Sequence, residues 1–305
     1  MALVLGIDGG GTRTRAVVAS DSNILSLASG AASNVRTCGP EAATAAIAAV
    51  VLDSLASAGV GPESIQAVAA GVAGISRRQE RDPVGAWLAA SFPGRPTTLV
   101  SDVELVLAAA PATREGVTVV AGTGSVVFGR KADGTTTRSG GWGPIVGDRG
   151  SGCAIGRDAL VATAEALDGM TVGGALVRLV AARTGATSAG DLGAGLEPSE
   201  IAALVPAVAE AADAGDPVAR AILGRAGTDL ARHVTSVLTR LGWTGAVTLA
   251  LSGGVLVHVP GVRERLLEEV QAAGWSLAAV SVVEQPVMGA VALATELLDA
   301  AGRPA

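Results

Sequence analysis

A run of three consecutive glycines near the N-terminus, Gly9–Gly11, constrains this chain more than any other feature. The apolar run Leu3–Ile7 predicts a strand before it, and Thr14–Ala19 predicts a second strand after it. Glycines tolerate the positive φ angles of a tight turn and leave backbone N–H groups uncovered, which suits a turn that holds phosphate oxygens. Asp8, at the end of the first strand, could bind a divalent cation directly or through water. A hairpin turn without a ligand is the open alternative.

Two commoner glycine motifs do not fit this turn. A Walker loop requires a lysine before its final Ser or Thr, and the segment Gly6–Thr12 has the threonine without the lysine. A dinucleotide fingerprint requires a third glycine or an alanine five residues after the first, followed by a helix. Counted from Gly9, that position is Thr14, and a β-rich run follows it.

Composition narrows the class of protein. A length of 305 residues suggests about two domains. The chain is 49% hydrophobic with only four Trp and two Phe, so its cores must consist of Ala, Val, Leu and Ile. The net charge of −6 argues against a nucleic acid or an anionic membrane as partner. Because Cys38 and Cys153 are too few for a zinc site or a disulfide framework, we expect reduced thiols in a cytoplasmic protein. A strand beginning at Leu3 leaves no room for a signal peptide.

Helical and strand patterns alternate along the rest of the chain, and Asn23 is expected in a turn. Helices are predicted at Pro40–Ala58, Asp82–Ala90, Gly152–Leu167, Gly174–Arg183, Ser199–Asp213, Pro217–Leu241, Val259–Ala273 and Val287–Ala301. Further strands are predicted at Ile65–Ala70, Thr97–Val100, Val247–Leu251 and Ala278–Val283.

The first glycine turn has a counterpart in Val117–Arg130, which again reads as an apolar strand, a small-residue turn and an apolar strand. Asp8 aligns with Gly122 in this duplication, and Gly10 aligns with Gly124. We therefore predict two α/β domains, residues 1–112 and 113–286, each led by a β-hairpin, with a ligand cleft between them. A final helix at about 287–305 is expected to pack on the first domain.

Six short motifs together carry a resemblance over nearly the whole chain. They are Gly6–Thr14, Ser101–Asp102, Gly122–Ser125, Gly140–Gly143, Gly147–Ser151 and Ser252–Gly254. This set resembles the acetate and sugar kinase/Hsp70/actin superfamily, and within it the BadF/BadG/BcrA/BcrD-type ATPases, most closely the N-acetylglucosamine kinases. The resemblance implies two ribonuclease H-like (actin-like ATPase) domains related by duplication, with a nucleotide and sugar cleft between them.

The same resemblance implies ATP-dependent phosphorylation of a sugar hydroxyl, with N-acetylglucosamine or glucosamine as the expected type of substrate. It implies that Asp8 orients Mg²⁺. It assigns the β- and γ-phosphates of ATP to Gly10, Gly11 and Thr12, a second phosphate turn to Thr123 and Gly124, and the adenosine to Gly253 and Gly254.

On the sugar side, Asp102 matches the family's catalytic base. Its position after a strand suits a carboxylate that takes a proton in a cleft, but a plain helix N-cap is an equally simple role. The other sugar-binding residues implied are Asn34, Gly74, Ser125, Gly141, Trp142, Gly143 and Asp148. Asn34 and Asp148 could instead be ordinary turn residues, and Trp142 could belong to a core.

Two positions depart from the family pattern. Val126 stands where these sugar kinases often have an asparagine that contacts the sugar, and Arg149 stands where they usually have glutamate. A guanidinium in place of a carboxylate would favour an acidic substituent on the substrate over an ammonium group. The resemblance therefore predicts sugar phosphorylation more firmly than a particular amino sugar.

Other functions on this fold remain open from the sequence. One is an ATPase that activates a 2-hydroxyacyl-CoA dehydratase or benzoyl-CoA reductase type system, in which a dimer shares an iron–sulfur cluster. Cys38 and Cys153 fall in different predicted halves, which suits that role poorly. A sugar-sensing ATP-binding protein without catalysis is another, whereas a sugar-responsive repressor would require a helix-turn-helix before Leu3. We expect a homodimer, with no nucleic-acid or membrane partner.

Overall fold

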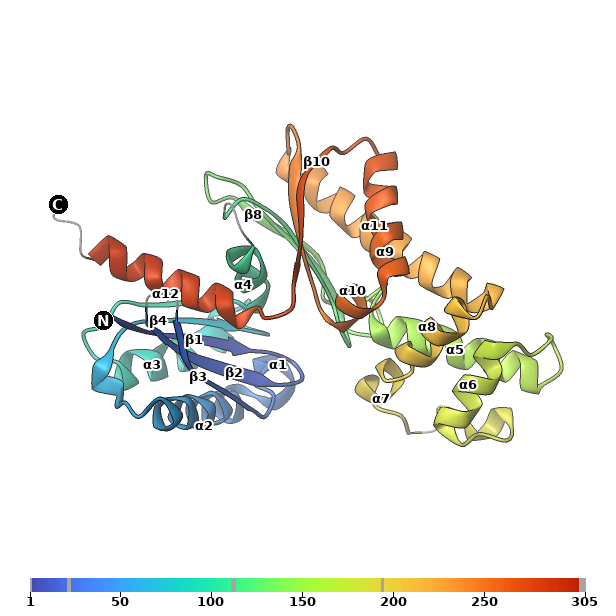
Figure 1. Cartoon of the computed structure of the whole chain (residues 1–305), viewed down its shortest axis with the longest axis horizontal. Helices are drawn as coiled ribbons and strands as arrows, with labels where there is room; N and C mark the ends of the chain where they lie inside the picture. The colour runs from blue at the N-terminus through green and yellow to red at the C-terminus, as the bar shows by residue number, and fades with distance from the viewer. Residues whose placement is uncertain (1, 21–22, 111–113, 193–194, 302–305) are drawn as a thin grey trace. The chain divides into compact units, whose positions relative to one another are not determined.

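The computed structural model describes residues 2–20, 23–110, 114–192 and 195–301 (Figure 1). The chain divides into unit 1, formed by Met1–Arg114 with Gln285–Ala305, and unit 2, formed by Glu115–Glu284. The predicted domain boundary after residue 112 lies outside the described residues, and so do residues 302–305 of the predicted final helix.

The sheet of unit 1 combines a β-meander with two parallel strands. Its strands are β1 (Leu3–Gly9), β2 (Thr14–Ser20), β3 (Asn23–Gly30), β4 (Ile65–Val72) and β5 (Thr97–Ser101). Their order across the sheet is β3-β2-β1-β4-β5; the first three run antiparallel to one another, and β4 and β5 run parallel to β1. The carboxyl ends of β1, β4 and β5 therefore share one edge of this sheet.

Helices cover both faces of the sheet in unit 1. They are α1 (Val35–Cys38), α2 (Pro40–Ala58), α3 (Arg78–Ser91), α4 (Asp102–Ala109) and α12 (Val287–Ala301) (Figure 1). Alternate residues of β1 face opposite sides: Leu5 and Ile7 join the core under α2 and α3, whereas Val4 joins the core under α12 and α4. Gly6 allows the close approach of α12, since a Cβ there would lie 2.7 Å from the backbone nitrogen of Val291.

Unit 2 repeats the strand connectivity of unit 1. Its strands are β6 (Gly116–Ala121), β7 (Ser125–Arg130), β8 (Thr136–Gly140), β9 (Val247–Ser252) and β10 (Leu277–Val283). Their order is β10-β9-β6-β7-β8, with β6, β7 and β8 antiparallel and with β9 and β10 parallel to β6. The predicted duplication is thus present in the topology, since β6 takes the place of β1 and β9 takes the place of β4.

The helices of unit 2 surround a core of aliphatic side chains. They are α5 (Gly152–Leu167), α6 (Ala175–Thr184), α7 (Pro198–Ala202), α8 (Val205–Asp213), α9 (Pro217–Leu241), α10 (Gly254–His258) and α11 (Pro260–Ala272). The long helix α9 packs on β6, β7 and β8 and against α11. Leu230, Val234 and Leu238 of this helix are fully buried, as its 3.6-residue apolar repeat predicts.

Helix ends with clear stop and start signals are confirmed, whereas weakly patterned elements differ from the prediction. Asn23 was expected in a turn but begins β3, and β8 was not predicted. The predicted helix start at Asp82 is wrong, because α3 begins at Arg78, where Glu80 accepts a hydrogen bond from the N–H of Arg77 at 2.8 Å. The predicted helix Ser199–Asp213 is divided into α7 and α8. The predicted helix Val259–Ala273 corresponds to α11, and the short helix α10 precedes it.

Among the described helices, α2 alone is long and apolar enough to cross a membrane. In unit 1 it instead covers the sheet, and Ile47, Val50 and Leu55 on one of its faces are buried in the core. A helix with the length and composition of a membrane span therefore belongs, in this protein, to the core of unit 1.

Candidate functional site

Two carboxylates act on each other at the strand edge of unit 1. Asp8 is the penultimate residue of β1 and pairs in register with Arg15 of β2. Burial is the largest cause that raises the pKa of Asp8 to about 7, and the negative charge of Asp102 is the second. The positive charges of Arg15 and Arg13 lower this pKa in part. The parallel arrangement of β1, β4 and β5 thus brings together two predicted site residues that are distant in sequence.

Asp102 is the first residue of α4, directly after β5. The N-cap position belongs to Ser101, whose N–H donates to Oε1 of Glu104 at 3.1 Å and whose hydroxyl donates to Oδ1 of Asp102 at 3.2 Å. The alternative role of Asp102 as the N-cap of this helix is therefore wrong.

The glycine turn of unit 1 closes with a hydrogen bond from the N–H of Gly10 to the carbonyl of Arg13 at 3.0 Å. Gly11, Thr12 and Arg13 at its tip are exposed. Behind the tip, the buried hydroxyl of Thr14 lies 2.8 Å from the hydroxyl of Ser33. The turn is thus anchored at its base while its tip faces solvent.

Asn34 lies between two of the predicted glycines. Its Oδ1 accepts a hydrogen bond from the N–H of Arg36 at 3.1 Å, which makes Asn34 the N-cap of α1. Its side-chain nitrogen lies 3.7 Å from the position of a Cβ at Gly11, and a Cβ at Gly74 would collide with Oδ1. Gly74 also has a φ of 83°, which favours glycine. Asn34 is therefore a structural cap whose amide group borders the glycine turn.

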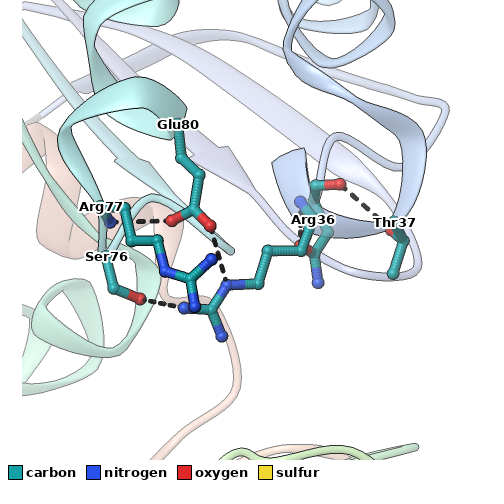
Figure 2. A network of polar contacts seen from close by, with 6 residues as sticks. Arg36, Thr37, Ser76, Arg77 and Glu80 are labelled. Carbon is teal, nitrogen blue, oxygen red and sulfur yellow. Dashed lines mark hydrogen bonds and ion pairs between the residues drawn. The ribbon is translucent and has the colours of Figure 1, made fainter.

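A polar network next to Asn34 was not predicted from the sequence (Figure 2). Arg36 of α1 donates from Nε to Oε1 of Glu80 at 3.2 Å and from Nη2 to the hydroxyl of Ser76 at 2.8 Å. Burial of Glu80 opposes ionisation, but the N–H of Arg77 and the Arg36 guanidinium hold the pKa of Glu80 below its ordinary value. The spacing from Arg77 to Glu80 is a capping signal, but nothing in the sequence pairs Glu80 with Arg36.

The glycine turn of unit 2 is held by the start of α5. The carbonyl of Gly122 accepts from the N–H of Gly152 at 2.7 Å, and the carbonyl of Thr123 accepts from the N–H of Cys153 at 3.2 Å. A Cβ on Gly253 would collide with Ala121 at the beginning of this turn, so the predicted adenosine segment adjoins the predicted phosphate turn. Gly254, at the start of α10, has no neighbour that a Cβ would meet.

Asp148 lies against the same turn. A Cβ on Gly124 would lie 2.7 Å from Oδ2 of Asp148, and the N–H of Gly143 donates to Oδ1 at 3.3 Å. Among the described residues other than glycine, Asp148 alone has a positive φ, 52°. Burial raises its pKa, although backbone hydrogen bonds from Gly143 and Ser125 and the nearby His233 act against that rise. The structure thus joins Gly124, Ser125, Gly143 and Asp148.

The segment Gly140–Gly143 exposes Trp142 rather than burying it. The Trp142 side chain is 58% exposed, and the Arg138 guanidinium lies 4.6 Å from the ring centroid. The alternative placement of Trp142 in a core is therefore wrong. Val126 of β7 packs against Gly141, because a Cβ on that glycine would lie 3.3 Å from the Val126 side chain.

Arg149 is 70% exposed, and its Nη1 lies 3.9 Å from Oδ2 of Asp229 on α9. His233, one turn after Asp229 on α9, shares a hydrogen bond of 2.7 Å with the hydroxyl of Ser139. Burial lowers the pKa of His233, against the opposing charge of Asp229.

Neither cysteine belongs to a larger group of metal ligands. Cys38 is exposed at the end of α1, and Cys153 is buried in α5. Across the described ranges, no three His, Cys, Asp or Glu side chains form a group that could hold a metal ion.

Comparison with protein families identifies the BadF/BadG/BcrA/BcrD ATPase family, whose model matches residues 5–294. The chain is 31% identical over 267 residues to the N-acetylmuramic acid/N-acetylglucosamine kinase of Clostridium acetobutylicum, covering 85% of this chain and 87% of that one. It is 30% identical over 258 residues to the N-acetyl-D-glucosamine kinase of Dictyostelium discoideum, covering 79% of this chain and 80% of that one.

Among solved structures, one from Chromobacterium violaceum superposes with a TM-score of 0.77 at 28% identity, covering 98% of this chain and 99% of that one. The protein in that structure is named, as a provisional assignment, an N-acetylglucosamine kinase. The predicted actin-like ATPase fold and the predicted family are both confirmed.

Proposed function

The chain belongs to the BadF/BadG/BcrA/BcrD ATPase family and is an ATP-dependent sugar kinase, and from that premise we propose that it phosphorylates an N-acetylated amino sugar with Asp102 as general base. The observation that carries this proposal is the placement of Asp8 and Asp102 at the carboxyl ends of β1 and β5, on the edge of the sheet where the glycine turn of unit 1 begins. Two carboxylates at the carboxyl ends of parallel strands, next to an exposed glycine turn, suit phosphoryl transfer.

The two glycine turns would bind the phosphates of ATP. In unit 1 the exposed tip formed by Gly11 and Thr12 would offer backbone N–H groups to phosphate oxygens, and Gly10, whose own N–H donates to Arg13, would form the base of the turn. In unit 2, Thr123 and Gly124 would form a second phosphate-binding turn. The open space beside Gly254 would admit the adenosine, and Gly253 lets this segment lie directly against Ala121 at the start of the turn.

Mg²⁺ fits the carboxylate pair of unit 1. Burial and the charge of Asp102 keep Asp8 from ionising easily, and a bound cation would offset both effects. Mg²⁺ commonly uses one or two carboxylates together with substrate phosphates and water. Asp8 would hold the ion, directly or through water, and the ion would neutralise charge on the phosphates.

Asp102 would accept the proton of the sugar hydroxyl. The hydroxyl oxygen forms a bond to the γ-phosphorus, the bond from that phosphorus to the bridging oxygen breaks, and ADP leaves. The hydroxyl proton passes to a carboxylate oxygen of Asp102, which later releases it to water. The position of Asp102 at the first residue of α4 supports this role, since Ser101 and Glu104 cap the helix without it.

The sugar would be held by polar groups that the two units present. In unit 1 these are the Asn34 amide beside Gly74; in unit 2 they are Asp148, Ser125 and the segment Gly141–Gly143 with Trp142. The buried Asp148, kept in place by the N–H of Gly143, suits acceptance of hydrogen bonds from sugar hydroxyls. N-acetylglucosamine and N-acetylmuramic acid, which appear in the names of the relatives, are the first candidates.

The test is a coupled ADP-release assay over a panel of free sugars, with the phosphorylated product identified by mass spectrometry. We expect ADP release that requires Mg²⁺ and an N-acetylated amino sugar, with one phosphate found on the sugar per ADP. ADP release without any phosphorylated sugar would contradict the proposal and favour an ATPase activator.

A further inference from the structure

The network of Arg36 and Glu80 borders a hollow that the proposed reaction does not use. The hollow has a volume of about 530 Å³ and is lined by Val35, Arg36, Pro40, Arg77, Gln79 and Glu80. Its charged lining consists of two guanidinium groups and one carboxylate, so it carries a net positive charge. Glu80 is 11% exposed in its side chain, and Arg36 is 35% exposed.

This hollow lies directly beside the proposed sugar residues of unit 1. The N–H of Arg36 donates to Oδ1 of Asn34, and the N–H of Val35 donates to the carbonyl of Ala73 at 3.1 Å. A Cβ on Gly74 would lie 2.9 Å from the backbone nitrogen of Arg36. The backbone of Arg36 is therefore adjacent to the Asn34 amide, and its side chain extends from there to Glu80 and Ser76.

The two arginines are held in different ways. Arg36 uses Nε for Glu80 and Nη2 for Ser76, so its guanidinium is fixed in place before any ligand binds (Figure 2). Arg77 binds Glu80 through its backbone N–H, so that bond does not require its side chain. Both positive charges act on Glu80, which places both near the same carboxylate.

The geometry points to this hollow as a subsite for a carboxylate carried by the sugar, so that Arg36 and Arg77 set a preference for acidic amino sugars. This inference rests on the proposed function, because Asn34 must hold the sugar. On this inference, the preference for an acidic substituent comes from Arg36 of α1 and from Arg77 at the start of α3. It does not come from Arg149, which pairs with Asp229. Guanidinium groups suit a carboxylate because they present parallel N–H donors.

The first experiment compares kcat/KM for N-acetylmuramic acid, its uncharged methyl ester and N-acetylglucosamine. Arg77→Gln and Arg36→Gln should each lower kcat/KM for the acid roughly tenfold relative to that for the ester, the size expected for one charge-assisted hydrogen bond. The matched control is Arg78→Gln. Arg78 is the next residue of α3, is 92% exposed and pairs with Asp82, so its loss should leave the acid-to-ester ratio within about twofold, as for a surface ion pair.

A substitution that should raise the acid-to-ester ratio of kcat/KM distinguishes recognition of charge from a loss of structure. Glu80→Gln keeps the side-chain shape and removes the carboxylate that competes for Arg36, so the acid-to-ester ratio should rise several-fold. A merely structural role for Glu80 would lower both rates together. An unchanged ratio in Arg77→Gln, Arg36→Gln and Glu80→Gln, with N-acetylglucosamine still phosphorylated, overturns the subsite and leaves the kinase proposal standing.

If no sugar is phosphorylated, the kinase proposal fails on its own, and calorimetry then tests the subsite. Tighter binding of N-acetylmuramic acid than of its methyl ester, lost in Arg77→Gln, would still support the subsite. Equal binding of the acid and the ester, or binding of neither, would overturn it.

Discussion

Asp8 of unit 1 and Asp216 of unit 2 are enclosed aspartates whose pKa values are shifted in opposite directions. Burial favours the neutral form of both. Around Asp8 the next largest influence is the charge of Asp102, and its pKa rises to about 7. Around Asp216, hydrogen bonds from the backbone N–H groups of Leu176, Ala219 and Val218 outweigh burial, and its pKa is lowered.

The contrast separates a structural carboxylate from one for which we propose a function. Asp216 caps α9 and also binds the start of α6, so the fold itself supplies the donors that its charge needs. Asp8 has a second carboxylate nearby, and the charges of Arg15 and Arg13 offset burial and that carboxylate only in part, because the pKa of Asp8 still rises. The predictions below test this contrast, from the largest expected effect on catalysis to the smallest.

Asp102→Asn should have the largest effect, a loss in kcat of about a hundredfold or more with little change in KM, because the amide keeps the shape but cannot accept the proton. Steady-state kinetics with saturating sugar would measure it. Glu104→Gln is the matched control, since Glu104 lies on the same helix and its amide oxygen can still accept from Ser101. A variant of Asp102 that keeps most of its kcat would remove Asp102 from the chemistry.

The position of Asp102 shows how far the sequence alone could go. A strand prediction placed Asp102 after Thr97–Val100, and the end of β5 at Ser101 agrees with it. Its proximity to Asp8 depends on the order β1-β4-β5, which the family resemblance implied but no local pattern contains. Arg36 and Glu80 were missed for the same reason, because their contact joins two segments that only the tertiary fold brings together.

Asp8→Asn should come second. We expect the Mg²⁺ concentration for half-maximal rate to rise about tenfold or more, since one ionised ligand is lost. A titration of rate against Mg²⁺ at fixed ATP measures this. An unchanged Mg²⁺ dependence would mean that other groups hold the ion.

The same variant has a second, opposite signature. A carboxylate whose pKa is raised on folding costs stability as the pH rises above its unfolded value. Without Mg²⁺, Asp8→Asn should therefore raise the Tm at pH 8 but have little effect near pH 4, where Asp8 is protonated in the folded protein. A Tm that falls at pH 8 would show that the Asp8 charge is already satisfied within unit 1.

The fold shows where local signals suffice and where they do not. The predicted bounds of α2, α5 and α9 match the structure because Pro, Gly or Ser residues mark their ends. The strands β3 and β8 were missed because each contains many polar or small residues and takes its place through pairing with β2 or β7. The start of α3 was misplaced because Pro83, a common first-turn residue, lies inside this helix.

Gly124→Ala should have a smaller effect, which tests whether Asp148, next to the glycine turn of unit 2, contacts the sugar. A Cβ at Gly124 would press on Oδ2 of Asp148, whereas a Cβ at Gly122 would meet nothing within 4 Å. We expect KM for the sugar to rise several-fold in Gly124→Ala and less in Gly122→Ala, as kinetics at saturating ATP would measure. Equal effects of the two substitutions would argue that Asp148 does not contact the sugar.

Asp216→Asn should have the smallest effect on catalysis and act on stability instead. The amide replaces one acceptor oxygen of a carboxylate that binds three backbone N–H groups, which should cost about 1–3 kcal/mol in the free energy of unfolding at pH 7.

Because folding lowers the pKa of Asp216, its contribution is fully present above its unfolded value of about 3.9 and is lost as the pH falls through the lower folded value. Urea unfolding at several pH values should show the difference between wild type and variant shrinking below about pH 4. Asp213→Asn, at an exposed aspartate of α8, is the control and should change stability little. A Mg²⁺ concentration for half-maximal rate that rose in Asp216→Asn, as we expect for Asp8→Asn, would break the contrast between the two aspartates.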